Sequence, residues 1–224
     1  MGNVSITTAG ALILVAGGGF LAMTGASLGQ SAGARAGDPA QGSHVAEGKC
    51  AQCHGADGNS SDPQFPKLAG QSPAYLYRQL ADFRNGIRKS DIMGPIAADL
   101  TDAEMANAAS FFGKQPRKAD AVKDQRLAAI GERIFFSGMP ACAMCHRASD
   151  RRGMMGGGMM GRMPMMGMMS GAPNLNGQHA AYIADQLDRF ASGARPSSTP
   201  MGRIAAALSE ADKRAVAEYL SGLR

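Results

Sequence analysis

Apolar residues recur at helical spacing along most of the chain, and no stretch shows the sustained alternation of a β-strand. One clear stripe joins Tyr75 and Leu76 to Leu80 and Phe83. Ser72 stands before this stripe as an N-cap, and a proline follows it at the first helical position. The pattern predicts a helix beginning at residue 73.

Three more helices are predicted by their starting signals and apolar periods. Residues 101–104 read Thr-Asp-Ala-Glu, a capping box that opens a helix running to Lys114. Residues 209–212 form a similar box before the last helix, and residues 124–136 have a helical apolar face. The sequence therefore predicts an all-α protein.

The first 34 residues form a separate segment. Residues 4–30 carry no charge and are mostly small or apolar, about the length that spans a bilayer as a helix. A retained membrane anchor is favoured because the segment lacks a basic start. The alternative is a secretory signal peptide cleaved near residues 32–36. Both interpretations export the chain from Arg35 onward.

The rest of the chain is a tandem duplication. Residues 65–75 match 172–182, residues 79–86 match 186–193, and residues 93–100 match 201–208. Self-similarity over this length indicates two copies of one domain. We expect domains at residues 40–116 and 127–224, joined by a linker at residues 117–126.

All four cysteines lie in two C-x-x-C-H pentads, at residues 50–54 and 142–146. This spacing is typical of covalent c-type haem attachment, in which both thiols bond the haem edge and the histidine binds the iron. A zinc site or a redox dithiol explains the paired motifs less well. We therefore predict two haem c groups, held by Cys50, Cys53 and His54 and by Cys142, Cys145 and His146.

The repeat also selects a second ligand for each iron. Of 16 methionines, only Met93 and Met201 occupy matching places in the two copies. A methionine opposite the histidine is the usual arrangement in electron-carrying cytochromes and raises the potential. The alternative is that both methionines fill gaps in the core. Met105 is expected to be a packing residue.

Histidines outside the pentads offer another possible ligand set. His44 and His179 have no counterpart in the other copy. His179 replaces the N-cap serine of the first copy. We expect both side chains to be solvent-exposed or to cap a helix.

A proline follows the pentad in both copies, at Pro66 and Pro173. Its carbonyl is expected to accept a hydrogen bond from the ring N–H of the proximal histidine and so fix the orientation of the ring. The alternative is that both are ordinary turn prolines.

The net charge of +5 is unevenly distributed, with −1 on residues 40–116 and +4 on residues 127–224. No basic stripe with reading groups accompanies it, so nucleic-acid binding is not expected. The basic second copy favours docking to an acidic redox partner.

The second copy has gained 15 residues after its pentad, within a Gly/Met-rich insertion at residues 153–171. Nine methionines lie in residues 154–169. Clustered thioethers suit Cu(I), so a copper-binding loop is one hypothesis. The alternatives are an adaptable docking loop and a segment that is oxidised in place of other residues.

Together, the two pentads, the two Pro-x-Leu-x-Gly-Gln segments and the two late methionines resemble the dihaem cytochrome c4 family. The resemblance implies two tandem cytochrome c-like domains, each wrapped around one haem and related by a pseudo-two-fold axis. It implies an electron carrier, not an enzyme, working in a bacterial periplasm between a quinol-oxidising complex and a terminal oxidase. The N-terminal helix would anchor it to the inner membrane. The alternatives are a fixed cytochrome subunit of an oxidase or dehydrogenase complex, and a dihaem redox enzyme.

Overall fold

The computed structural model describes residues 37–138, 140–146 and 171–224, all within one unit, Ala34–Arg224. Within these ranges the regular elements are helices and there are no strands, which confirms the all-α prediction. The predicted N-terminal helix and the methionines of residues 154–169 lie outside the described residues. No helix in the described ranges is long and apolar enough to cross a membrane.

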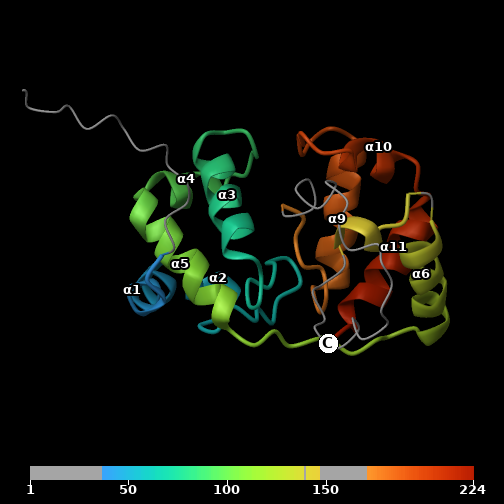
Figure 1. Cartoon of the computed structure of the whole chain (residues 1–224), viewed down its shortest axis with the longest axis horizontal. Helices are drawn as coiled ribbons and strands as arrows, with labels where there is room; N and C mark the ends of the chain where they lie inside the picture. The colour runs from blue at the N-terminus through green and yellow to red at the C-terminus, as the bar shows by residue number, and fades with distance from the viewer. Residues whose placement is uncertain (1–36, 139, 147–170) are drawn as a thin grey trace, which may run out of the picture. The chain divides into compact units, whose positions relative to one another are not determined.

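The elements follow the duplication in the sequence (Figure 1). The first half contains α1 (Pro39–Val45), the π-helical turn η1 (Ala46–Cys50), α2 (Ala51–His54), α3 (Pro73–Arg84), α4 (Met93–Ala98) and α5 (Asp102–Lys114). The second half contains α6 (Gln125–Ser137), α7 (Ala143–His146), α9 (Ala180–Ala191), α10 (Met201–Ala206) and α11 (Glu210–Ser221).

The predicted helix starts are present. The Ser72 hydroxyl accepts from the backbone N–H of the third residue of α3. Thr101 and Glu104 bond each other's backbone N–H groups, as do Ser209 and Asp212. Each box satisfies N–H donors that the first helical turn leaves without a partner.

The connection between the halves covers residues 115–124, because α6 already begins at Gln125, within the predicted linker. It is tied to the first half by Asn59, whose amide donates to Pro116 O at 3.0 Å and accepts from Lys118 N–H at 2.8 Å. These hydrogen bonds hold the connection against the first half.

Each half is built on one close helix crossing. α1 crosses α5, and α6 crosses α11. A Cβ at Gly42 would collide with the carbonyl of Asn107, and one at Gly131 would collide with the carbonyl of Ala215. At each crossing the two helix backbones approach so closely that only glycine fits.

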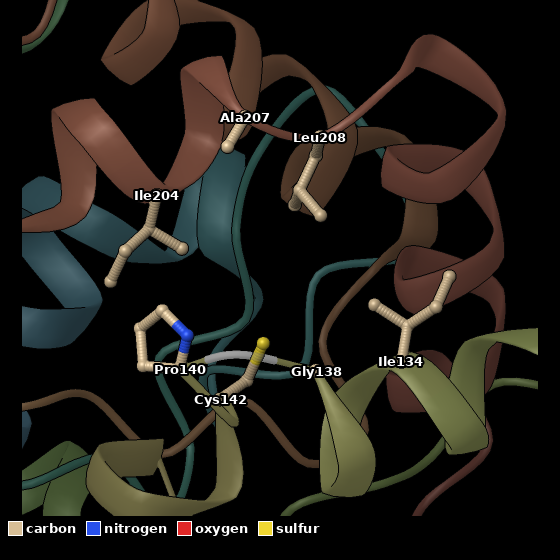
Figure 2. Close-up of a pocket in the computed structure, with 7 residues that line it drawn as sticks. All are labelled: Ile134, Gly138, Pro140, Cys142, Ile204, Ala207 and Leu208. Carbon is tan, nitrogen blue, oxygen red and sulfur yellow. The ribbon is translucent and has the colours of Figure 1, made fainter.

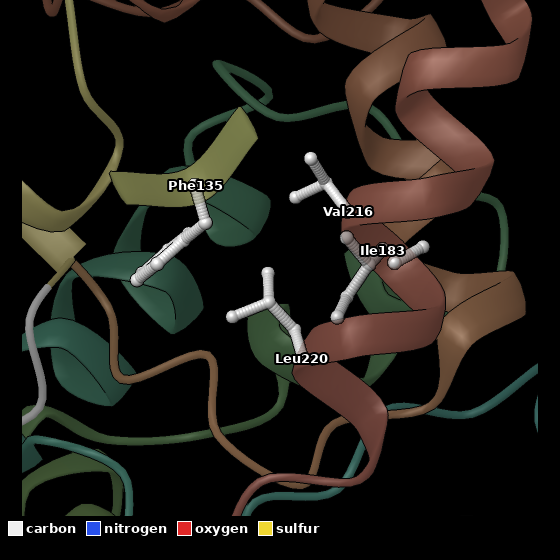
Figure 3. Close-up of a cluster of buried hydrophobic side chains, with 5 residues drawn as sticks. Phe135, Ile183, Val216 and Leu220 are labelled. Atoms are coloured by element: carbon white, nitrogen blue, oxygen red, sulfur yellow. The ribbon is translucent and has the colours of Figure 1, made fainter. Parts of the chain in front are cut away.

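The two cores use different side chains at equivalent places. In the first half, Ala46 packs near Phe112, which is 2% exposed. In the second half, Phe135 of α6 faces Leu220 of α11, with Ile183 and Val216 beside them (Figure 3).

One expectation about the histidines is wrong. His179 stands at the N-cap of α9 but makes no side-chain cap, and it is only 5% exposed. Its ring lies 2.7 Å from the Asp120 carboxylate and 3.0 Å from Ser60 O. His179 thus bonds the connection and the first half, two partners that the pattern around residue 179 does not indicate. His44 is exposed at the end of α1, as expected. Met105 is fully buried, as expected of a packing residue.

Candidate haem sites

The first pentad spans a change of helix type. η1 ends at Cys50, and Cys53 and His54 close the short helix α2. Gly55 follows with φ of +77°, which ends the helix. Cys50 is half-buried, and burial raises the pKa of its thiol to about 11.

His54 is held in one orientation. Its Nδ1 lies 2.8 Å from Pro66 O, and the ring is 6% exposed. Since a carbonyl only accepts, Nδ1 carries the proton and Nε2 is left free. Burial lowers the pKa of His54, so the ring is neutral, as a metal ligand must be. Phe65 stands edge-on to the ring, with 6.2 Å between ring centres.

The second pentad repeats this arrangement in α7. His146 Nδ1 lies 3.2 Å from Pro173 O, and the ring is 9% exposed. Burial lowers the pKa of His146 too, against a smaller raising effect of the carbonyl. The structure therefore has the predicted histidine–proline contact in both halves. Cys142 is half-buried and Cys145 is exposed.

Met93 and Met201 occupy equivalent places here as well. Each is the half-buried first residue of a six-residue helix, α4 or α10. The Met93 N–H donates to Ser90 Oγ at 3.0 Å, which fixes the start of α4.

A cavity of about 230 Å³ lies between the second pentad and α10. Figure 2 shows the Cys142 sulfur directed toward this space, with Ile204 and Leu208 across it and Ile134 on one side. Apart from Cys142 the lining residues have apolar side chains or none, and they include Gly138, Pro140 and Ala207. Apolar side chains around a thiol suit one edge of a covalently attached macrocycle.

Two arginines that the sequence motifs did not indicate lie where they could neutralise the negative charge of a bound group. Arg88 donates to Tyr182 Oη and Gln186 Oε1, both at 2.8 Å. Arg195, in the other half, is 8% exposed. It contacts the corresponding residues of the first half, Tyr75 Oη at 2.9 Å and Gln79 Oε1 at 2.7 Å.

Each of these guanidinium groups also stacks on an aromatic ring of its own half, 4.5 Å from the ring centre. Within the described residues neither has a carboxylate at ion-pair distance. A partly buried pair of cations without carboxylates fits a group that brings its own, as haem does with its propionates. Arg88 and Arg195 are 107 residues apart, which is the offset of the Pro-x-Leu segments, so the alignment of the two copies was the signal that could have found them.

Comparison with known proteins agrees with this geometry. The cytochrome c family profile matches residues 39–123 and 128–224. Cytochrome c4 of Pseudomonas aeruginosa is 39% identical over 84% of this chain and 90% of the relative. A thiosulfate dehydrogenase electron acceptor of Stutzerimonas stutzeri is 35% identical over 81% of this chain and 82% of the relative.

A solved structure shares the fold over the same region. The crystal structure of reduced recombinant cytochrome c4 from Pseudomonas stutzeri superposes with a TM-score of 0.71 and 34% identity. The match covers 84% of this chain and all of that one. The chain therefore belongs to the dihaem cytochrome c4 family: it is an electron-transfer protein with two cytochrome c domains and one covalent haem c in each.

Proposed function

We propose that this dihaem cytochrome carries single electrons in the periplasm, from a quinol-oxidising complex to a terminal oxidase. The observation that supports the proposal is that each copy contains both a histidine bonded to a proline carbonyl and a methionine at the start of a short helix. His54 pairs with Met93, and His146 pairs with Met201. Two protein ligands at each iron leave no position for a substrate, which favours a carrier over an enzyme.

The chain's residues have distinct roles in this proposal. Cys50 and Cys53 hold the first haem by thioether bonds, and Cys142 and Cys145 hold the second. Each haem iron supplies a one-electron couple. Since the protein supplies both axial ligands of each iron, an electron enters or leaves with little rearrangement of the protein.

The surrounding groups orient the ligands and balance charge. Pro66 and Pro173 each accept the ring proton of a proximal histidine and fix its tautomer. Arg88 and Arg195 are placed to neutralise propionates, since their other acceptors are uncharged. The excess positive charge of residues 127–224 favours an acidic partner surface on that side. Nucleic acid is not among the proposed partners.

A second candidate differs in the electron donor. The relative from Stutzerimonas stutzeri is an electron acceptor of a thiosulfate dehydrogenase. This chain is 35% identical to that relative. If it has the same kind of donor, it is a carrier or a fixed subunit that serves a dehydrogenase. The N-terminal segment, as a membrane anchor, would favour a fixed subunit over a shuttle.

Gentle extraction of the native membranes distinguishes these alternatives. A shuttle is released as a single protein, is reduced by the quinol-oxidising complex and is reoxidised by the oxidase. Co-purification with an oxidase supports a fixed subunit. Reduction by a thiosulfate dehydrogenase but not by the quinol-oxidising complex supports the second candidate and overturns the first.

Copper binding by the methionine tract stays a separate prediction. Cu(I) titration of the exported chain, compared with a variant lacking residues 153–171, tests it directly. Equal Cu(I) binding by the two proteins would exclude a copper loop.

A further inference from the structure

The peptide unit between Pro66 and Lys67 bonds on both of its sides. Its carbonyl accepts from His54 Nδ1 at 2.8 Å. Its N–H donates to the side-chain oxygen of Gln178 at 2.8 Å. Gln178 belongs to the second half, so one peptide unit joins the histidine of one domain to a glutamine of the other.

The second half contains the equivalent bridge, with the roles of the two halves exchanged. Pro173 O accepts from His146, and the N–H of the same peptide unit, on Asn174, donates to Gln71 Oε1 at 2.9 Å. Gln71 lies in the first half. The bridges therefore cross: each proximal histidine is linked to a glutamine of the opposite domain.

Both glutamines are fixed in place. Gln71 and Gln178 are each 5% exposed. Their amide groups donate back, to Asn174 O and Lys67 O respectively, both at 2.9 Å. The preceding glycines have φ of +64° and +68°, a left-handed turn that favours glycine and leads directly into each glutamine.

Hydrogen bonds through one peptide unit strengthen each other. An acceptor on the N–H moves electron density to the carbonyl oxygen, which then accepts more strongly from the histidine, by about 10–30% per bond. A stronger bond at Nδ1 makes the imidazole a better donor to the iron and stabilises the oxidised state. The glutamine therefore lowers the reduction potential of a haem that it does not touch.

We propose that Gln178 is a positioning residue for His54 and the first haem, and Gln71 for His146 and the second haem. The crossed bridges couple the electronic state of each haem to the packing of the opposite domain. This inference rests on the proposed histidine ligation. The effect is larger at the first haem, because the His54 bond is 2.8 Å and the His146 bond is 3.2 Å.

The test uses the full chain with both haems and the variants Gln178→Met and Gln71→Met. Methionine keeps the length of the side chain but offers no strong acceptor. Redox titration of Gln178→Met should show an upward shift of the first haem and no change of the second. Gln71→Met should show the converse, with a smaller shift. Comparison with Met93→Ala and Met201→Ala proteins assigns each potential to its haem.

Proton NMR of the reduced protein gives a second reading. The ring Nδ1–H resonance of His54 should move upfield in Gln178→Met, as expected when its hydrogen bond weakens. In Gln178→Glu the acceptor for Lys67 N–H remains, so neither the upfield move nor the upward potential shift should occur. This variant keeps the inference testable if the methionine variant folds poorly.

Tyr75→Phe and Tyr182→Phe are the matched controls. Each removes one hydrogen bond that an arginine donates between the halves, without touching either bridging peptide unit. If these controls reproduce the shifts, or if a glutamine variant shifts both haems equally, shifts the haem of its own domain or shifts neither, the crossed coupling is wrong. If the wild-type protein lacks histidine–methionine ligation, the proposed function fails first, and its optical spectrum shows this separately.

Discussion

The two halves of the chain pack equivalent pairs of helices with large and small side chains exchanged. The large side chain lies on the C-terminal helix of the first half and on the N-terminal helix of the second. In the first half a small residue on the N-terminal helical segment, Ala46, is paired with Phe112 on α5. In the second half the large residue is Phe135 on α6, and its partner on α11 is the smaller Leu220. The crossing glycines and the histidine–proline contacts, by contrast, are the same in both halves.

This difference separates two kinds of constraint. A hydrophobic core needs a total volume and tolerates different ways of filling it. A backbone crossing or an oriented ligand needs one particular group at one position. Residues that stay the same between the halves are therefore the candidates for positioning the haems.

The largest effect is expected from the two methionines proposed as axial ligands. Met93→Ala and Met201→Ala should each remove methionine ligation from one iron and leave the other unchanged. About half of the methionine–iron signal should be lost, and the potential of the altered haem should fall, since methionine raises it. Optical spectra and redox titration measure both effects. Unchanged spectra in either variant would identify that methionine as a core residue.

The next largest effect is expected on stability, when the large side chain at the contact between α6 and α11 is removed or moved to the other helix. Phe135→Ala should destabilise the second half by about 3–5 kcal/mol, because it leaves a cavity beside Leu220. Adding Leu220→Phe reproduces the arrangement of the first half and should recover a substantial part of the loss. Urea unfolding of the three proteins provides the comparison. A double variant no more stable than the single one would show that the two cores are not volume-equivalent.

Substitution at the helix crossings should have a smaller effect, of similar size in both halves. Gly42→Ala and Gly131→Ala force a methyl group into a backbone carbonyl and should each cost about 1–3 kcal/mol by overpacking. Gly48→Ala is the control, because a Cβ there meets no atom within 4 Å. Equal unfolding midpoints for Gly42→Ala and Gly48→Ala would argue against a tight crossing.

The smallest effect concerns the tie between the first half and the connection. Lys118 donates to Asp57 at 2.8 Å and lowers the pKa of that carboxyl to about 2, from 3.8. This depressed pKa contributes stability above about pH 3.8 that is lost as the pH falls toward about 2. Both side chains are more than a third exposed, so solvent screening limits the contribution to under about 1 kcal/mol.

Asp57→Asn should therefore lower stability slightly at pH 7 and much less near pH 2. Urea unfolding at both pH values measures the difference, and Asp57→Asn in a Lys118→Met background is the control. An equal loss at both pH values would show that the effect does not come from the charge on Asp57.

Local signals in the sequence predicted the helix starts well. Ser72, Thr101 and Ser209 act through neighbours three residues away, so their roles can be read from the chain itself. The repeat likewise led to the prolines that contact the histidines. Contacts with distant partners could not be predicted in the same way.

His179 shows why. Its partners, Asp120 and Ser60, lie 59 and 119 residues away and meet only in the folded protein. The crossed bonds of Gln71 and Gln178 also depend on how the two copies pack. The glutamines were visible as part of the repeated motif, but their role was not.

The most direct test of the central claim is an optical and magnetic spectrum of the oxidised, full-length protein with both haems attached. The account predicts two low-spin irons, each with one histidine and one methionine ligand. A high-spin signal or a bis-histidine signal at either iron would contradict it.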